Sequence, residues 1–105
     1  MEDNSISKKP YKGSGLKFLL KIEVEGFSMA DNDFKVVIRN FRQEKEITKQ
    51  EMHLTEDEEY IFTINTAELG SGEYIMKTIA YVPDSDFESG FRTEVQKQVL
   101  CVVMS

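Results

Sequence analysis

The stretch LKFLLKIEVE, residues 16–25, decides the fold class of this chain. Apolar side chains recur at every second position from Leu16 to Val24, and charged side chains stand between most of them. Successive side chains of a β-strand point to opposite faces, whereas a helix would scatter these residues around its circumference. The alternation therefore predicts a strand over residues 16–24 with one buried face.

Strand-like segments rich in β-branched and aromatic residues follow at short intervals. They cover residues 34–39, 45–48, 60–64, 73–82 and 91–103. Residues 49–59 fit either a strand or a short helical turn. No helical segment is long enough to connect parallel strands. The sequence therefore predicts an all-β fold, an antiparallel two-sheet sandwich of about seven strands.

A corner and two long strands complete the predicted core. Residues 65–72 are expected to form a turn in which Thr66 caps one helical turn and Leu69 closes the end of the core. Residues 73–82 are apolar in both phases, which is typical of a strand in the centre of its sheet. In residues 91–103 the phase that includes Val95 and Val99 is mostly apolar, and we expect it to face the core.

Chain length and charge bear on domain organisation and on nucleic-acid binding. The 105 residues give one domain, with a flexible polar N-terminal arm over residues 1–14 and a single β-sandwich domain over residues 15–105. The net charge is −6, and basic residues cluster only at Lys8-Lys9-Lys12 and Arg39-Arg42-Lys45. The first cluster lies in the arm and the second is interleaved with glutamates, so nucleic-acid binding is not expected.

The sequence also bears on localisation. The longest apolar run, residues 99–104, has six residues and is far shorter than the roughly 20 that a membrane helix needs, so no membrane segment is predicted. Residues 1–14 are polar and lack the apolar region of a signal peptide, so none is expected there. Its single cysteine, Cys101, excludes an internal disulfide. We therefore expect a cytoplasmic location from composition alone.

No arrangement of residues predicts catalysis. His53 is the only histidine, and no nucleophile, base and acid can be matched to it from spacing. Cys101 shares a strand phase with Val99 and Val103, so it is interpreted as a small buried hydrophobe. Alternating aromatic residues are read as core rather than as a carbohydrate platform: Tyr60, Phe62, Tyr74 and Tyr81. We expect no enzyme activity, no catalytic residue and no organic cofactor.

Calcium is the one cofactor that the sequence suggests. Asp84, Asp86 and Glu88 are spaced two apart, as in a calcium loop, and Asp31 with Asp33 would join them if both loops share one end of the sandwich. The remainder of an EF-hand is missing. The competing interpretation, that these carboxylates solvate turns, is favoured.

The corner carries a family resemblance. Residues 60–81 run as a strand, then Asn65-Thr66-Ala67-Glu68-Leu69-Gly70-Ser71-Gly72, then a strand that contains Tyr74. This order resembles bacterial and phage immunoglobulin-like modules, and residues 15–103 as a whole are similar to small phage- or prophage-encoded structural proteins of the baseplate and tail. The resemblance implies an immunoglobulin-like sandwich with a structural or adhesive role, and it adds a virion-associated location as the alternative to a cytoplasmic one. The chain lacks the cysteine pair and core tryptophan of antibody-type domains.

Two functions remain open from the sequence. The first is a non-catalytic structural or protein-interaction module, such as a phage or prophage virion accessory protein. It would act by sheet-edge or sheet-face contact with a protein partner or by self-association. The alternative is a calcium- or carbohydrate-binding sandwich that uses the acidic loops at residues 31–33 and 84–88.

Overall fold

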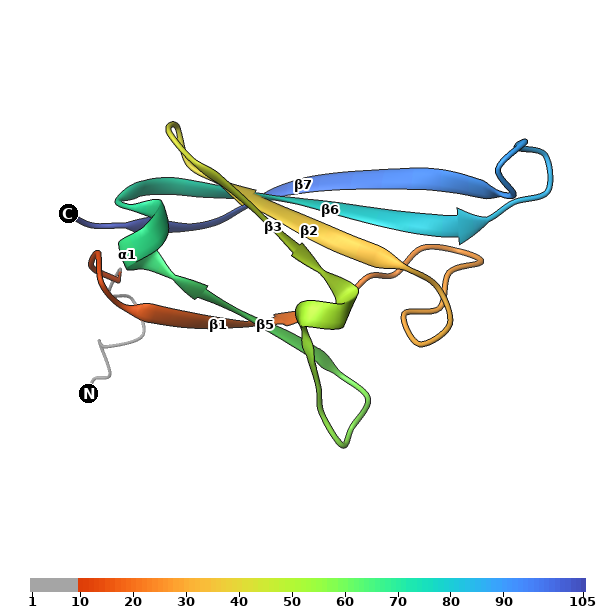
Figure 1. Ribbon diagram of the computed structural model, residues 1–105, viewed down its shortest axis with the longest axis horizontal. Helices are drawn as coiled ribbons and strands as arrows, with labels where there is room; N and C mark the ends of the chain where they lie inside the picture. The colour runs from red at the N-terminus through yellow and green to blue at the C-terminus, as the bar shows by residue number, and fades with distance from the viewer. Residues whose placement is uncertain (1–9) are drawn as a thin grey trace.

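The computed structural model describes residues 10–105 and folds them into two antiparallel sheets (Figure 1). One sheet has the order β1 (Gly15–Leu20), β5 (Tyr60–Asn65), β4 (His53–Leu54). The other has the order β3 (Glu44–Thr48), β2 (Phe34–Arg39), β6 (Gly72–Pro83), β7 (Phe91–Val103). Two single turns complete the elements, the 3₁₀ turn η2 (Lys49–Glu51) and α1 (Thr66–Leu69). The predicted all-β architecture of two antiparallel sheets is confirmed.

Strand β1 is shorter than its apolar alternation predicted. It ends at Leu20, which pairs with Tyr60, the first residue of β5. The pairing stops there because β5 offers no residue beyond that point. The alternation nevertheless reports burial correctly, since Ile22 is buried and Val24 packs against the core.

The core lies between the two sheets. Phe34 of β2 and Tyr60 of β5 meet edge to face, with ring centroids 5.1 Å apart. Such pairs join the facing sheets through large apolar surfaces. Tyr60, Phe62 and Tyr74 are buried as predicted, whereas Tyr81 is half-buried on the opposite face of β6.

The corner between β5 and β6 closes one end of the core. Leu69 is buried there, as predicted. The prediction that Thr66 caps the helical turn is wrong, because the side chain of Asn65 accepts the hydrogen bond from the Ala67 N–H. The hydroxyl of Tyr74 donates to the Gly70 carbonyl and ties the corner to the start of β6.

Thr66 instead anchors the N-terminal segment. Its fully buried hydroxyl accepts a hydrogen bond from the Gly13 N–H at 2.8 Å and donates to the Ser14 carbonyl at 2.7 Å. The Lys12 N–H donates to the Met104 carbonyl at 2.7 Å, which places this segment beside the end of β7. Of the predicted arm, residues 10–14 are thus held against the domain, and residues 1–9 lie outside the described residues.

The prediction that the apolar phase of residues 91–103 faces the core is wrong for most of β7. Tyr74 pairs with Cys101 and Ile75 pairs with Val99, so Leu100 is an extra residue that forms a bulge. A bulge of one residue reverses which face the following side chains occupy. Val103 therefore faces the core, whereas Val95 and Val99 point away from it and are 51% and 59% exposed.

Candidate functional site

The predicted calcium residues of the second acidic loop are placed by hydrogen bonds within the chain. The Asp84 carboxylate accepts from the Asp86 N–H at 3.0 Å and from the Arg92 guanidinium at 2.9 Å. These bonds, the backbone bond first, hold the pKa of Asp84 below its usual value. Both oxygens of Asp84 are thus engaged, and Asp86 and Glu88 are exposed.

The other two predicted metal residues lie in the loop before β2. The Asp31 N–H bonds to Ser28, and the Asp33 carbonyl accepts from the Tyr81 N–H. Both acidic loops lie toward the same end of the long axis (Figure 1). Within residues 10–105, no three histidine, cysteine or acidic side chains form a group that could hold a metal ion. Calcium binding remains a sequence prediction that no contact in the structure favours.

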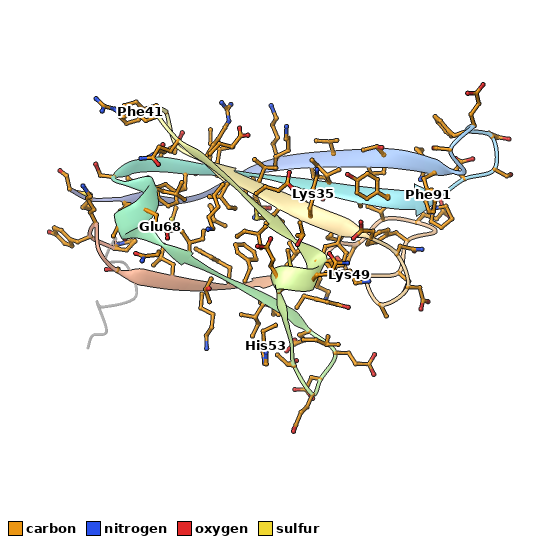
Figure 2. All side chains as sticks on the ribbon, viewed as in Figure 1. Lys35, Phe41, Lys49, His53, Glu68 and Phe91 are labelled. Atoms are coloured by element: carbon orange, nitrogen blue, oxygen red, sulfur yellow. The ribbon has the colours of Figure 1, made fainter. Side chains whose placement is uncertain are left out.

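The two residues considered for catalysis lie apart. His53 is exposed on the three-stranded side of the molecule (Figure 2). Cys101 is half-buried in β7 and packs against the core. Burial raises the pKa of the Cys101 thiol, which disfavours the nucleophilic thiolate.

The predicted basic cluster of Arg39, Arg42 and Lys45 does not stay together in the fold. Lys45 forms an ion pair with Glu68 at 3.5 Å, and the Arg42 guanidinium lies 5.4 Å from the centre of the Phe41 ring. Arg39 lies instead on the outer face of the four-stranded sheet. Lys8 and Lys9 lie outside the described residues. The described part of the predicted clusters does not form one basic surface.

The outer face of the four-stranded sheet carries an exposed apolar surface. Strand register places Ile75 opposite Val99 and Ile79 opposite Val95, and these side chains point away from the core. Phe91 continues the row at the far end of the hairpin, where it is 45% exposed (Figure 2). We call this surface the outer row; it comprises Ile75, Ile79, Tyr81, Phe91, Val95 and Val99.

Cations interrupt the outer row. Lys77 lies directly opposite Lys97, and like charges in that relation destabilise a strand pair. Both lysines line a shallow depression together with Arg39 and Glu44. The surface is therefore apolar at its ends and positively charged at its centre.

Backbone hydrogen bonds identify which groups of β6 serve each neighbouring strand. Adjacent residues of a strand point their N–H and C=O groups to opposite sides. The Tyr81 N–H donates to Asp33 at 3.1 Å, on the β2 side. The Asp84 N–H donates to Gly90 at 2.9 Å, on the β7 side. Odd-numbered residues of β6 thus bond β2, and even-numbered residues bond β7.

The register then defines a free edge on β7. Even-numbered residues of β6 over 76–82 lie opposite residues 92, 94, 96 and 98 of β7, so these bond each other. The backbone groups of the intervening residues point outward, where residues 10–105 supply no further strand. We call this segment the free edge; its outward residues are Phe91, Thr93, Val95, Lys97 and Val99.

The backbone hydrogen bonds of Met104 independently support this assignment of outward-pointing groups. Beyond the bulge the phase reverses, so the Met104 backbone should point outward. It does: its N–H donates to the Pro10 carbonyl and its carbonyl accepts from the Lys12 N–H, each at 2.7 Å. The N-terminal segment therefore covers the last residue of this edge, and among the described residues nothing covers the edge over 91–99.

The free edge is long and exposed on both faces. Every residue from Val95 to Val99 is exposed, including Gln96 and Gln98 on the inner side. The β6–β7 hairpin projects past the end of β1, so the three-stranded sheet does not lie beneath this part of it (Figure 1). The opposite edge, β3, is five residues long and begins with three charged residues.

Sequence reasoning found the strand at residues 91–103 but missed its role. Its apolar phase was assigned to the core because the alternation continues through Cys101 to Val103. Only the polar composition of the other phase, Arg92 to Gln98, is unusual for a strand of this length. That signal does not distinguish an edge strand from a strand with a solvated outer face.

Comparison with known proteins adds no identity to this geometry. The chain matches no family model, no curated protein and no solved structure. Within residues 10–105, no helix has the length and apolar character needed to cross a membrane. The free edge and the outer row are therefore the features of the described residues from which a function can be inferred.

Proposed function

We propose that this chain is a non-catalytic protein-interaction module that binds a protein partner by strand addition at the free edge of β7. The observation that carries the proposal is an edge of residues 91–99 whose outward backbone groups lie beside half-exposed valines. Unpaired N–H and C=O groups in a row are a template for another strand. Apolar side chains on alternate positions add specificity to that pairing.

The proposal includes an immunoglobulin-like sandwich. In that fold one sheet holds strands A, B, E and D, and the other holds C, F and G, with a strand C′ beside C in variable-type domains. In this comparison β1 takes the place of B, β2 that of C and β3 that of C′, and β4 to β7 take the places of D to G, with no named strand in the place of A among residues 10–105. The observed orders β1-β5-β4 and β3-β2-β6-β7 are compatible with it. The Tyr74 hydroxyl bonds back to Gly70 at the corner before β6, as the tyrosine corner of such domains does.

A finer proposal concerns the biological setting. The corner over residues 65–72 resembles that of bacterial and phage immunoglobulin-like modules, and residues 15–103 are similar to small phage or prophage proteins of the tail and baseplate. We therefore propose a virion accessory protein as the specific form of the interaction module. Virion components assemble through repeated protein contacts, which suits a module that presents one open sheet edge.

Site-specific photo-crosslinking in the source cell tests the module. A photoreactive amino acid at Lys97, on the free edge, should yield one defined protein adduct. The same group at exposed Thr63, on the three-stranded sheet, is the matched control and should yield none. The adduct supports the proposal only when the identified protein, once purified, binds again and Lys97→Pro weakens that binding.

The proline substitution is chosen for its geometry. Lys97 points its N–H away from β6, so proline there removes a donor from the free edge and none from the folded sheet. Equal adducts at Lys97 and Thr63, or no adduct from probes at Thr93, Lys97 and Val99, would overturn the proposed function.

A further inference from the structure

We infer that the strand added at the free edge comes from a second copy of this chain, paired antiparallel so that the two Val95 residues lie opposite each other. This inference rests on the proposed function and names its partner. A two-fold axis midway between the two Val95 residues relates the copies, so each contributes the same surface to the interface. Nine residues of each strand, 91–99, then pair along their whole length, which matches the extent of the free edge.

Hydrogen-bond geometry permits this pairing without rearrangement. In the Val95-centred register an odd-numbered residue of one copy always lies opposite an odd-numbered residue of the other. The outer face of one copy therefore continues into the outer face of the other. Phe91 meets Val99 of the second copy, and Thr93 meets Lys97 of the second copy. All these residues point their backbone groups outward, so the two strands can exchange about ten backbone hydrogen bonds.

Side-chain chemistry selects this register over its neighbours. Centring on Lys97 would oppose two lysines, and centring on Glu94 would oppose two glutamates, both of which are unfavourable. Centring on Gln96 would place Val95 against Lys97 and so pair apolar with charged residues. Only the Val95-centred register opposes Val95 to Val95 and Phe91 to Val99 while leaving every charged residue opposite an uncharged one.

Internal ion pairs already satisfy the charges on the inner side of the edge. Arg92 donates to Asp84 at 2.9 Å and to Glu94 at 2.8 Å within one chain. In the Val95-centred register Arg92 faces Gln98, and Glu94 faces Gln96. The pairing therefore breaks neither ion pair of Arg92 and leaves no charge of the inner side without its partner. The outer rows of the two copies also become continuous across the axis.

A disulfide trap tests the register. In a Cys101→Ala background, Val95→Cys places two thiols opposite each other at the separation of a paired strand, about 5.5 Å between Cα atoms. Thr93→Cys and Lys97→Cys are matched controls on the same face, and their like residues lie about 13 Å apart along the strands. Mild oxidation should convert Val95→Cys to a covalent dimer at least tenfold faster than either control.

Light scattering measures the association itself. The native chain should rise from 12.1 kDa toward twice that mass as concentration increases. Lys97→Pro should stay at the monomer mass while keeping its native circular dichroism. Because that variant could fail to fold, the disulfide trap provides the independent test.

The outcomes separate the two proposals. A monomer up to about 1 mM, or a trap that favours Thr93→Cys or Lys97→Cys, would overturn the inference. If crosslinking at Lys97 then yields a different, reconstituted protein, the proposed function stands with another partner. If crosslinking also fails, both fall.

Discussion

Strands β6 and β7 belong to one hairpin and both alternate apolar residues, yet they differ in burial. On β6 every second residue from Tyr74 to Val82 is buried. On β7 the apolar residues Val95 and Val99 lie on the outer face, opposite Ile79 and Ile75, and are more than half exposed. β6 has β2 and β7 on its two sides, whereas over residues 91–99 β7 has β6 as its one neighbouring strand within residues 10–105. Alternation of apolar residues thus indicates that a segment is a strand, whereas the elements packed beside and beneath it decide which of its faces is covered.

The largest expected effect lies at the buried start of β6. Tyr74→Ala removes a fully buried ring and should lower the free energy of unfolding by about 3–5 kcal/mol, in the range of other aromatic truncations. Tyr74→Phe keeps the ring and loses the bond to Gly70, so it should cost about 1 kcal/mol. Urea denaturation of the three proteins checks this order. Equal losses for both variants would show that packing of the ring does not dominate.

A smaller loss is expected where the N-terminal segment meets the corner. Thr66→Val keeps the shape of the buried side chain but leaves the Gly13 N–H without its acceptor. An unsatisfied buried group costs about 1–3 kcal/mol. Thr66→Ser keeps the hydroxyl and is the control for the methyl group. Hydrogen exchange at Gly13 should accelerate in the valine variant alone, and equal exchange in both variants would contradict the anchoring role.

The next effect depends on pH and lies at the far end of the hairpin. The pKa of Asp84 is lowered in the folded chain by the Asp86 N–H and by Arg92. Asp84 therefore stabilises the fold above its unfolded pKa of about 3.9, and this contribution is lost as pH falls through the lower folded pKa.

Asp84→Asn should accordingly reduce the melting temperature at pH 7. The difference from the native chain should disappear at the lowest pH. Thermal melts across pH measure it, with Glu88→Gln as an exposed control in the same loop. A constant difference at every pH would exclude ionisation of Asp84 as its cause.

The smallest expected effect lies on β7 itself. Val99→Ala removes an exposed side chain, and at a concentration where the chain is monomeric its stability should change by no more than about 0.5 kcal/mol. Val36→Ala, on buried β2, should cost several times more. A large loss in Val99→Ala would mean that the outer row is covered within one copy of the chain.

Part of the candidate site was accessible from the sequence. The strand at residues 91–103 and its exit from the turn after Pro83 follow from local pattern and from proline chemistry. That β7 is an edge strand was not accessible, because edge position depends on which strands lie beside it in space. The bulge at Leu100 was also hidden, since it adds one residue to β7 without interrupting the alternation of apolar residues.

The acidic loops show the same limit. Their spacing suggested a common calcium site, but the position of a carboxylate oxygen depends on its hydrogen-bond partners. Asp84 is held by Arg92, eight residues along the chain, and by the local Asp86 N–H. Spacing alone could not distinguish a carboxylate engaged in this way from one free to bind a cation.

Local sequence pattern was sufficient to predict that the chain forms strands, where most of them lie, and that Leu69 and the aromatic residues of β5 close the core. These properties follow from period-two burial and turn chemistry, which act between residues close in the chain. The packing of the folded chain sets which face of β7 meets solvent, why Asn65 rather than Thr66 caps the corner, and that the edge over residues 91–99 has no partner strand among residues 10–105. Those outcomes depend on contacts between distant segments, whose geometry a local pattern does not encode.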